Sequence, residues 1–238
     1  MTGVGTAHGQ ANGPVTLDPS NARLGTSLVL GLDAPAGPLT VVLPRGTRFD
    51  RRAAAPGGPI GFGRYVMAVQ GFLPGGGGTT QLVWSLAATL GKSAGQVTVT
   101  ATLLGGDSVA ALLQPQLGTT VPATTTTQAR FARSAGRLEF RLAGLPAQLT
   151  PAAPATATPA RLELSLSASR SARQTFFHRV KVPTASGGFR IQRIRDHRLV
   201  TRDLLRTPAS CTSSWAYTLR SGAQRTAGRI PCLAPLVP

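Results

Sequence analysis

Short stretches in which apolar and polar residues alternate recur along the whole chain, and they predict β-strands. Because successive side chains of a strand point to opposite faces, this alternation makes one face apolar and the other polar. It is clearest at residues 97–103, 138–142 and 162–166, with turns rich in Gly and Pro between such stretches. No segment shows a sustained apolar period of 3.6 residues. The pattern therefore predicts an all-β fold of antiparallel β-sandwiches with little helix.

A change of composition near the middle of the chain predicts a domain boundary. Residues 114–128, QPQLGTTVPATTTTQ, carry no charge and few large apolar side chains, which is typical of a linker. We therefore expect two Ig-like β-sandwich domains, at residues 15–113 and 129–238. Residues 1–14 are small and Gly-rich, and we expect them to be disordered. The alternative is a single sandwich in which the Thr- and Pro-rich stretch is a long surface connection.

The two cysteines, Cys211 and Cys232, flank a segment that has the pattern of a β-hairpin. Ser221-Gly222 is a favoured turn dipeptide, because Gly tolerates a positive φ and Ser can hydrogen-bond the nearby backbone. A two-residue loop at this dipeptide places Cys211 directly opposite Cys232, at a non-hydrogen-bonded position where side chains are closer. The sequence therefore predicts a disulfide, which contributes roughly 3 kcal/mol in the chain-entropy model. The alternative is two free thiols in a reducing cytosol.

The same register predicts which side chains of the hairpin are buried. Trp215, Tyr217 and Leu219 share one mostly apolar face. Trp215 lies opposite Gly228, where no side chain competes with the indole. A shift of one residue would turn these side chains to the solvent, so the apolar pattern and the turn support the same register. Two thiols without nearby His or Cys ligands do not make a metal site.

Positive charge is concentrated in the second half of the chain. The formal net charge is +17. Residues 1–120 hold seven basic and four acidic residues, and residues 121–238 hold eighteen and four. One segment supplies six arginines, which form the candidate anion-binding cluster: Arg190, Arg193, Arg195, Arg198, Arg202 and Arg206. Guanidinium groups bind phosphates and carboxylates in a forked geometry, so the cluster indicates an anionic partner. The alternative is a solvated strand face enriched in arginine by GC-rich coding.

The class of anionic partner follows from the residues around these arginines. Nucleic-acid binding favours aromatic side chains interleaved with basic ones, and Phe189 is the aromatic residue at hand in this segment. Nucleic acid is therefore possible but not favoured, and the expected partner is an anionic cell-surface polymer. An acidic polysaccharide and an anionic membrane surface both fit the net charge. The sequence points to no cofactor and no metal.

Catalytic motifs do not emerge from the sequence. Residues 91–93, GKS, end like a phosphate-binding loop, but Leu86 stands where that motif needs Gly. No Gly-x-Ser-x-Gly elbow occurs. His178 lies on the apolar face of its strand, where a partly buried histidine with a satisfied hydrogen bond is expected. Asp196 and His197 could belong to a catalytic triad, yet they lie among arginines and fit surface charge better.

The chain has no apolar run of about 18 residues, so no transmembrane helix is expected. Its first residues, MTGVGTAHGQANGP, lack the basic and apolar regions of a signal peptide. Together with the expected disulfide, this start indicates a mature exported chain or a start site placed too far downstream.

One resemblance agrees with export. The pattern Thr207-Pro208, Cys211, Trp215-Ala-Tyr217, Gly222 and Cys232, preceded by basic strands, resembles the C-terminal end of uncharacterised secreted proteins from high-GC actinobacteria. Residues 43–50 and 60–63 are similar to the N-terminal half of the same family. The resemblance implies an exported all-β protein and no particular activity.

These observations lead to three hypotheses about function. The first is a secreted or cell-wall-associated, non-enzymatic protein with a structural or adhesive role. The second is a binding module that holds an anionic polymer, polysaccharide or nucleic acid, through the Arg-rich C-terminal half. The third is a secreted hydrolase, whose carboxylates or triad would meet only in the folded chain.

Overall fold

The computed structural model describes residues 13–50, 57–71, 78–93, 95–145, 156–166 and 169–234. Fifteen strands and one helix form within them. In chain order they are β1 (Val15–Asp18), β2 (Ser27–Asp33), β3 (Leu39–Val42), β4 (Arg48–Phe49), β5 (Pro59–Gln70), β6 (Thr79–Leu90), β7 (Gln96–Leu103), α1 (Gly106–Leu117), β8 (Thr124–Ser134), β9 (Arg137–Leu142), β10 (Thr156–Leu166), β11 (Ser169–Pro183), β12 (Phe189–Asp203), β13 (Leu205–Arg206), β14 (Ser214–Ser221) and β15 (Gln224–Pro231).

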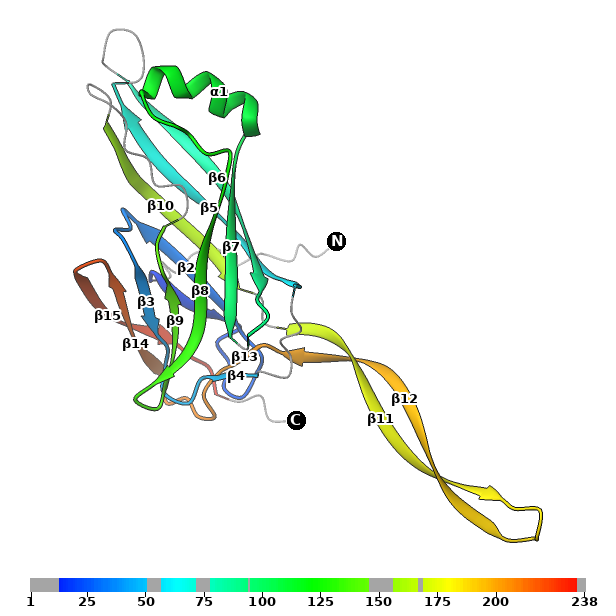
Figure 1. Cartoon of the computed structure of the whole chain (residues 1–238). Coiled ribbons are helices and arrows are strands. Elements are labelled where there is room, and N and C mark those ends of the chain that lie inside the picture. Colours follow the sequence, from blue (N-terminus) through cyan, green and yellow to red (C-terminus); the bar gives the residue numbers. More distant parts are fainter. Residues whose placement is uncertain are drawn as a thin grey trace, which may run out of the picture.

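Eleven of these strands form one large antiparallel sheet. Its order is β1-β2-β10-β5-β6-β7-β8-β9-β3-β14-β15. The sheet curls toward closure, since a parallel bridge between Asn21 and Leu233 links the chain beside its first and last strands. Figure 1 shows this curled body, with α1 at one end and a long pair of strands projecting from the other side. The all-β prediction is confirmed, and the architecture is a near-barrel.

The prediction of two Ig-like domains is wrong, because strands from both halves of the chain share the sheet. β10 belongs to the second half, yet it pairs with β2 on one side and β5 on the other. The supposed linker is regular structure: residues 114–117 end α1, and residues 124–128 begin β8. Thr is polar but β-branched, so a Thr-rich run without charge is a good half-exposed strand.

The inward face of the sheet encloses a hydrophobic core. Trp84, Tyr65 and Phe140 are among the largest fully buried side chains. The Tyr65 and Trp84 rings lie 6.1 Å apart, and Phe131 lies 5.1 Å from Phe140 and stacks on Phe49 at 4.9 Å. Such ring pairs add to the free energy gained by burying apolar surface. The alternation at residues 97–103, 138–142 and 162–166 is confirmed, with its apolar positions buried.

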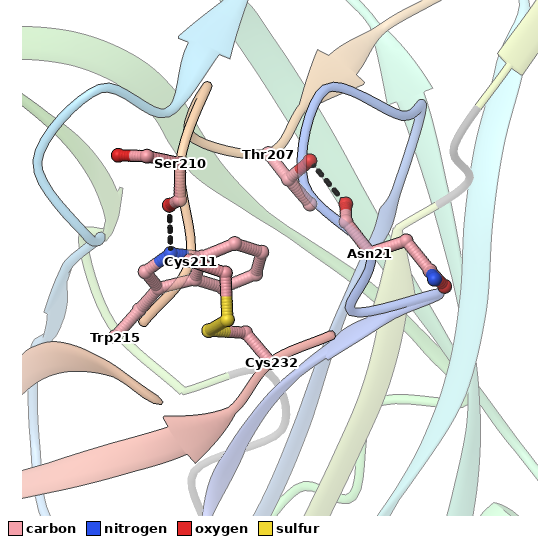
Figure 2. The surroundings of a disulfide bond; sticks show 6 residues. All are labelled: Asn21, Thr207, Ser210, Cys211, Trp215 and Cys232. Carbon is pink, nitrogen blue, oxygen red and sulfur yellow. Dashed lines mark hydrogen bonds between the residues drawn. A yellow bond between two sulfur atoms is a disulfide. The ribbon is translucent and has the colours of Figure 1, made fainter. Parts of the chain in front are cut away.

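The C-terminal hairpin and its disulfide are present. Cys211 and Cys232 are bonded, with 5.9 Å between their Cα atoms. Figure 2 shows the bond beside the Trp215 indole, whose Nε1 donates a 2.8 Å hydrogen bond to the carbonyl oxygen of Ser210. Close by, the Thr207 hydroxyl donates to the carbonyl oxygen of Asn21 at 2.6 Å. This part of the chain is thus tied to the N-terminal strands as well as to itself.

The predicted register of the hairpin is wrong by two residues. Ser221 pairs with Gln224, so the two-residue loop begins at Gly222, whose φ is 56°. Pairing of β14 with β3 fixes this position, and the Gly222 amide donates to Pro38 at 3.0 Å. Because the register differs by an even number of residues, each side chain stays on the face of the hairpin that was predicted for it.

The burial of the hairpin side chains is as predicted, but their partners on the opposite strand differ. Trp215 and Tyr217 are buried as predicted, but Tyr217, and not Trp215, lies opposite Gly228. A Cβ built on Gly228 would overlap the Tyr217 hydroxyl, so the glycine makes room for the phenol ring. Cys211 precedes β14 and reaches Cys232 from outside the strand pairing.

Candidate anion-binding ribbon

β11 and β12 form a two-stranded ribbon that leaves the body of the molecule (Figure 1). Their pairing runs without a register shift from Ser169–Asp203 to Pro183–Phe189. Each strand has 15 residues, which at about 3.3 Å per residue span roughly 50 Å. No other strand in the described ranges pairs with either of them. A two-stranded ribbon is marginally stable alone in water, so its exposed faces are available for a partner.

A tight loop closes the far end of the ribbon. The Thr184 amide donates to Gly188 at 2.8 Å, and the Gly187 amide donates back to Thr184 at 3.1 Å. Gly187 has a φ of 83°, a conformation that favours glycine. The Thr184 hydroxyl also accepts a hydrogen bond from the Gly188 amide at 3.1 Å. These contacts set the register that brings the basic residues of the two strands face to face.

One face of the ribbon gathers cations. Directly paired residues share a face, so Arg179 lies opposite Arg193, and Phe177 lies opposite Arg195. Lys181 follows two residues after Arg179 on the same face. We call Arg179, Lys181, Arg193 and Arg195 the cationic face. All four side chains are exposed, and within the described part of the chain none has a carboxylate within salt-bridge distance.

The ring of Phe177 contacts the guanidinium groups of two of these cations. The guanidinium carbon of Arg193 lies 4.1 Å from the centre of the Phe177 ring, and that of Arg195 lies 5.7 Å from it. Exposed cation–π contacts of this kind contribute roughly 0.5–1 kcal/mol. They restrain the guanidinium groups without neutralising them. The two arginines therefore keep their charge and their N–H donors for a ligand.

On the opposite face of the ribbon, Asp196 forms ion pairs with neighbouring basic side chains. Asp196 accepts a 2.7 Å hydrogen bond from Arg198 Nε, and His178 Nε2 lies 3.4 Å from the same carboxylate. The hydrogen bond from Arg198 lowers the pKa of Asp196 below its ordinary value, so the carboxylate remains charged. Arg190, on the same face, has no carboxylate within salt-bridge distance in the described chain, so this face is compensated only in part. Residues 169–203 together carry nine basic and two acidic residues, a net +7.

The six arginines predicted as one cluster do not form one site. Arg193 and Arg195 lie together on the cationic face, whereas Arg190 and Arg198 lie on the other side of the ribbon. Arg202 lies 3.6 Å from Asp50 at the base of the ribbon. Arg206 lies beyond the ribbon, in β13, and donates to Asp203 at 3.1 Å.

Three residues of the site come from the partner strand and were missed. Phe177, Arg179 and Lys181 are on β11, and the sequence analysis treated their strand separately from the arginine-rich one. The signal that could have found them is the turn sequence at residues 184–188, TASGG, which stands between two extended stretches rich in basic residues. That pattern predicts a hairpin and hence the shared face.

The histidines do not form a triad. His178 and Asp196 are close, but the carboxylate is also bound by Arg198. His197 lies on the other face, where its Nδ1 is 3.2 Å from the Thr175 hydroxyl. The prediction that His178 is partly buried is wrong, because its side chain is 46% exposed on a ribbon that no further layer covers. The described residues also contain no group of three His, Cys, Asp or Glu side chains placed to hold a metal ion.

No protein-family model, no curated protein and no solved structure matches this chain. Its described part contains no helix of the length and apolar character that a membrane span requires. The disulfide indicates an oxidising, non-cytoplasmic compartment. The charge, exposure and shape of the ribbon are therefore the observations that bear on function.

The ribbon also exposes apolar side chains. Six of the large hydrophobic residues that are exposed in the described structure lie on it: Phe177, Val180, Phe189, Ile191, Ile194 and Leu199. Soluble proteins seldom place so many apolar side chains in one unsupported element unless it contacts a partner. Charge and apolar surface together indicate a contact surface.

Proposed function

We propose that this protein is secreted, associates with the cell envelope and acts as a non-enzymatic adhesive that binds an acidic polysaccharide through the cationic face of the ribbon. One observation carries the proposal: four exposed cations on a projecting ribbon have no carboxylate partner in the described structure. Guanidinium and ammonium groups in this state bind carboxylates or sulfates of a polymer.

The spacing of the cations favours a polymer. Arg179 and Arg193 are directly opposite one another, and like charges at such positions destabilise a strand pair. A bound anion relieves this repulsion. Lys181 and Arg195 extend the charge along the ribbon in both directions from that pair, so a chain with repeated negative groups can follow the same face.

A second copy of this chain is a poor partner. Docking a ribbon of net +7 needs an acidic surface, but the remainder of the chain carries a further +10. Nucleic acid is less favoured than polysaccharide for two reasons. The disulfide indicates a non-cytoplasmic compartment. Phe177, the aromatic residue within the cationic face, already has two guanidinium groups against its ring, which leaves less of it for base stacking.

The test compares two variants with the same loss of charge. In the ribbon variant, Lys181→Gln, Arg193→Gln and Arg195→Gln are combined. In the control variant, three exposed arginines of the body are changed, and they are Arg45→Gln, Arg225→Gln and Arg229→Gln. Both are applied to immobilised heparin and to immobilised polygalacturonate. We expect the ribbon variant to elute at much lower salt than the control.

Equal retention of the two variants would show that net charge alone holds the protein to the polymer, and the proposed role of the ribbon would then be wrong. Preferential retention of the wild type on single-stranded DNA over both polysaccharides would favour nucleic acid. Far-ultraviolet circular dichroism checks that both variants keep the fold of the wild type.

A second candidate is an anionic lipid surface, because the far end of the ribbon is apolar. Phe189 and Ile191 are 73% and 68% exposed, and Lys181 is the direct partner of Ile191. Apolar side chains beside cations are typical of segments that insert at the interface of an anionic bilayer. Co-sedimentation with phosphatidylglycerol vesicles, compared with phosphatidylcholine vesicles, separates the two candidates. Loss of vesicle binding in Phe189→Ser with Ile191→Ser, while heparin retention persists, favours the lipid surface.

A further inference from the structure

A second cationic feature lies on the body of the molecule, apart from the ribbon. A hollow of about 720 Å³ opens over β3, β7, β8 and β9. Its volume is within the range typical of sites for small ligands. Arg130, Arg133 and Arg141 contribute to its lining, which contains no Asp or Glu. The hollow is therefore a basic depression in a sheet whose other face packs the core.

Strand register explains how the charges come together. Thr40 on β3 is the direct partner of Arg141 on β9, Arg141 is the partner of Arg130 on β8, and Arg130 is the partner of Gln96 on β7. These four residues form one row across four strands, with neighbouring Cβ atoms about 4.5–5.5 Å apart. The row places two guanidinium side chains directly opposite one another, an arrangement that is unfavourable unless an anion lies between or above them.

One of the three charges is compensated and two are not. Glu139 accepts a 2.7 Å hydrogen bond from Arg141 Nε. Arg130 has no carboxylate within salt-bridge distance among the residues that the structure describes. Neither has Arg133, but it pairs with the buried Leu138 and so belongs to the other face of the sheet from Arg130. The hollow thus has a surplus of positive charge.

Another hollow, of about 930 Å³, shows the contrast. Arg64 and Arg161 line it, and both bind Glu163, at 2.6 and 2.7 Å. The hydrogen bond from Arg64 lowers the pKa of Glu163, which keeps that carboxylate ionised. Asp33 lies 3.9 Å from Arg161 in addition. Its charges are satisfied internally, so this larger hollow gives no reason to expect an anion.

Neutral polar groups complete the smaller hollow. Thr40 and Ser93 supply hydroxyls, and Gln96 and Gln128 supply amides that are hydrogen-bonded to each other at 3.4 Å. Hydroxyls and amides both donate and accept, which matches the hydroxyl groups of a sugar ring. A bare inorganic anion would use the arginines and leave these groups without a role.

We propose that this hollow binds an acidic saccharide unit. Arg130, with Arg141 directly opposite it, holds its carboxylate or sulfate, and Thr40, Gln96 and Gln128 bind its hydroxyls. The proposal does not rest on the ribbon, because it concerns different residues on a different element. If both sites are used, the body holds a sugar unit while the ribbon holds a longer stretch of polymer.

The experiment removes the contribution of the ribbon first. Isothermal titration calorimetry is carried out on the full chain that carries Lys181→Gln, Arg193→Gln and Arg195→Gln. The probe is trigalacturonate, and neutral maltotriose is its matched control. We expect saturable binding of trigalacturonate and much weaker binding of maltotriose. Arg130→Gln, added to this background, is expected to weaken binding of trigalacturonate roughly tenfold or more, since a charge-assisted hydrogen bond is lost.

Matched variants make the result decisive. Arg225→Gln removes one exposed arginine outside the hollow and is expected to leave binding unchanged. Gln96→Ala is the second hollow variant, in case Arg130→Gln perturbs the fold, since Gln96 is the direct partner of Arg130. The proposal is overturned if trigalacturonate does not bind, if both hollow variants bind it like the background, or if inorganic sulfate binds as tightly and marks an adventitious anion only. Heparin retention of the otherwise wild-type Arg130→Gln variant tests the ribbon separately, so the two proposals can fail independently.

Discussion

The affinity of the ribbon for an acidic polymer is expected to fall as the salt concentration rises. The number of free cations on the ribbon sets the slope of log K against log salt. Four cations of the cationic face lack carboxylate partners in the described chain, so each can neutralise one charge of the polymer. Neutralisation releases condensed counterions, and the slope of log K against log salt is about −0.7 to −0.9 per contact for nucleic acids, taken here for a comparable polyanion. Four contacts give a slope of about −3 to −3.5, so affinity falls roughly 50- to 150-fold between 50 and 200 mM salt.

The assay is the affinity for a heparin oligosaccharide in a series of salt concentrations, measured by fluorescence anisotropy with a labelled oligosaccharide. Lys181→Gln, Arg193→Gln and Arg195→Gln together leave one of the four contacts, so the slope should fall to about −1. The control, Arg45→Gln with Arg225→Gln and Arg229→Gln, should keep the slope of the wild type. If the control flattens the slope as much as the ribbon variant, binding is a property of net charge and the reasoning from the ribbon fails.

Three further outcomes are expected. Replacing Cys211 and Cys232 by Ser should lower the free energy of unfolding by about 3 kcal/mol, because the bond closes a loop with a sequence separation of 21; urea unfolding followed by Trp fluorescence measures it, and a loss below about 1 kcal/mol would contradict the estimate. Gly228→Ala should destabilise by about 1–3 kcal/mol, because the new methyl group overlaps the buried Tyr217 ring; an unchanged thermal midpoint would show that the ring moves freely. Asp196→Asn removes a carboxylate whose pKa is lowered by Arg198, so elution from heparin should shift to higher salt, and a shift to lower salt would mean that the ion pair orders the ribbon.

The strands could be predicted from the sequence, but the way in which they pair could not. Alternation at residues 97–103 or 162–166 is a local signal, and each side of such a strand sees either the core or water. The position of β10 between β2 and β5 depends on contacts between residues that are 86 or more positions apart in the chain. Nothing in a local pattern identifies such a partner, so two separate sandwiches were an equally good interpretation of the same strands.

The composition of residues 114–128 misled the prediction for a physical reason. A linker and a half-exposed strand of Thr residues both lack charge and large apolar side chains. They differ in β-branching, which favours the extended backbone. The helix before β8 was predicted only in part. Val109–Leu113 fitted either a strand or a turn of helix, because the twelve-residue helix contains Pro115 and shows no long apolar period.

A cationic cluster was predicted on the arginine-rich strand, but not which residues would lie together on one face. A cationic cluster was expected, and Arg193 and Arg195 belong to the cationic face. The sequence could not show which arginines would find carboxylates within the fold, and that distinction separates Arg198 and Arg202 from the four residues of the cationic face. It also could not show that Phe177 would lie between the guanidinium groups, since this requires the register of the ribbon.

The ribbon breaks the rule that predicted the rest of the fold, and this is the strongest structural reason to assign it a function. In the body, alternation marks a strand whose apolar face is buried, as in β7, where Val97, Val99 and Ala101 are fully buried. β11 alternates in the same way over Phe176, His178, Val180 and Val182, yet Val180 remains exposed, and no third strand in the described ranges pairs with the ribbon. Ordering a two-stranded ribbon alone contributes little to the free energy of folding. It forms few apolar contacts, and these hardly offset the loss of conformational entropy. We therefore expect a partner to supply the free energy that orders the ribbon, and the charges on its faces favour an anionic one.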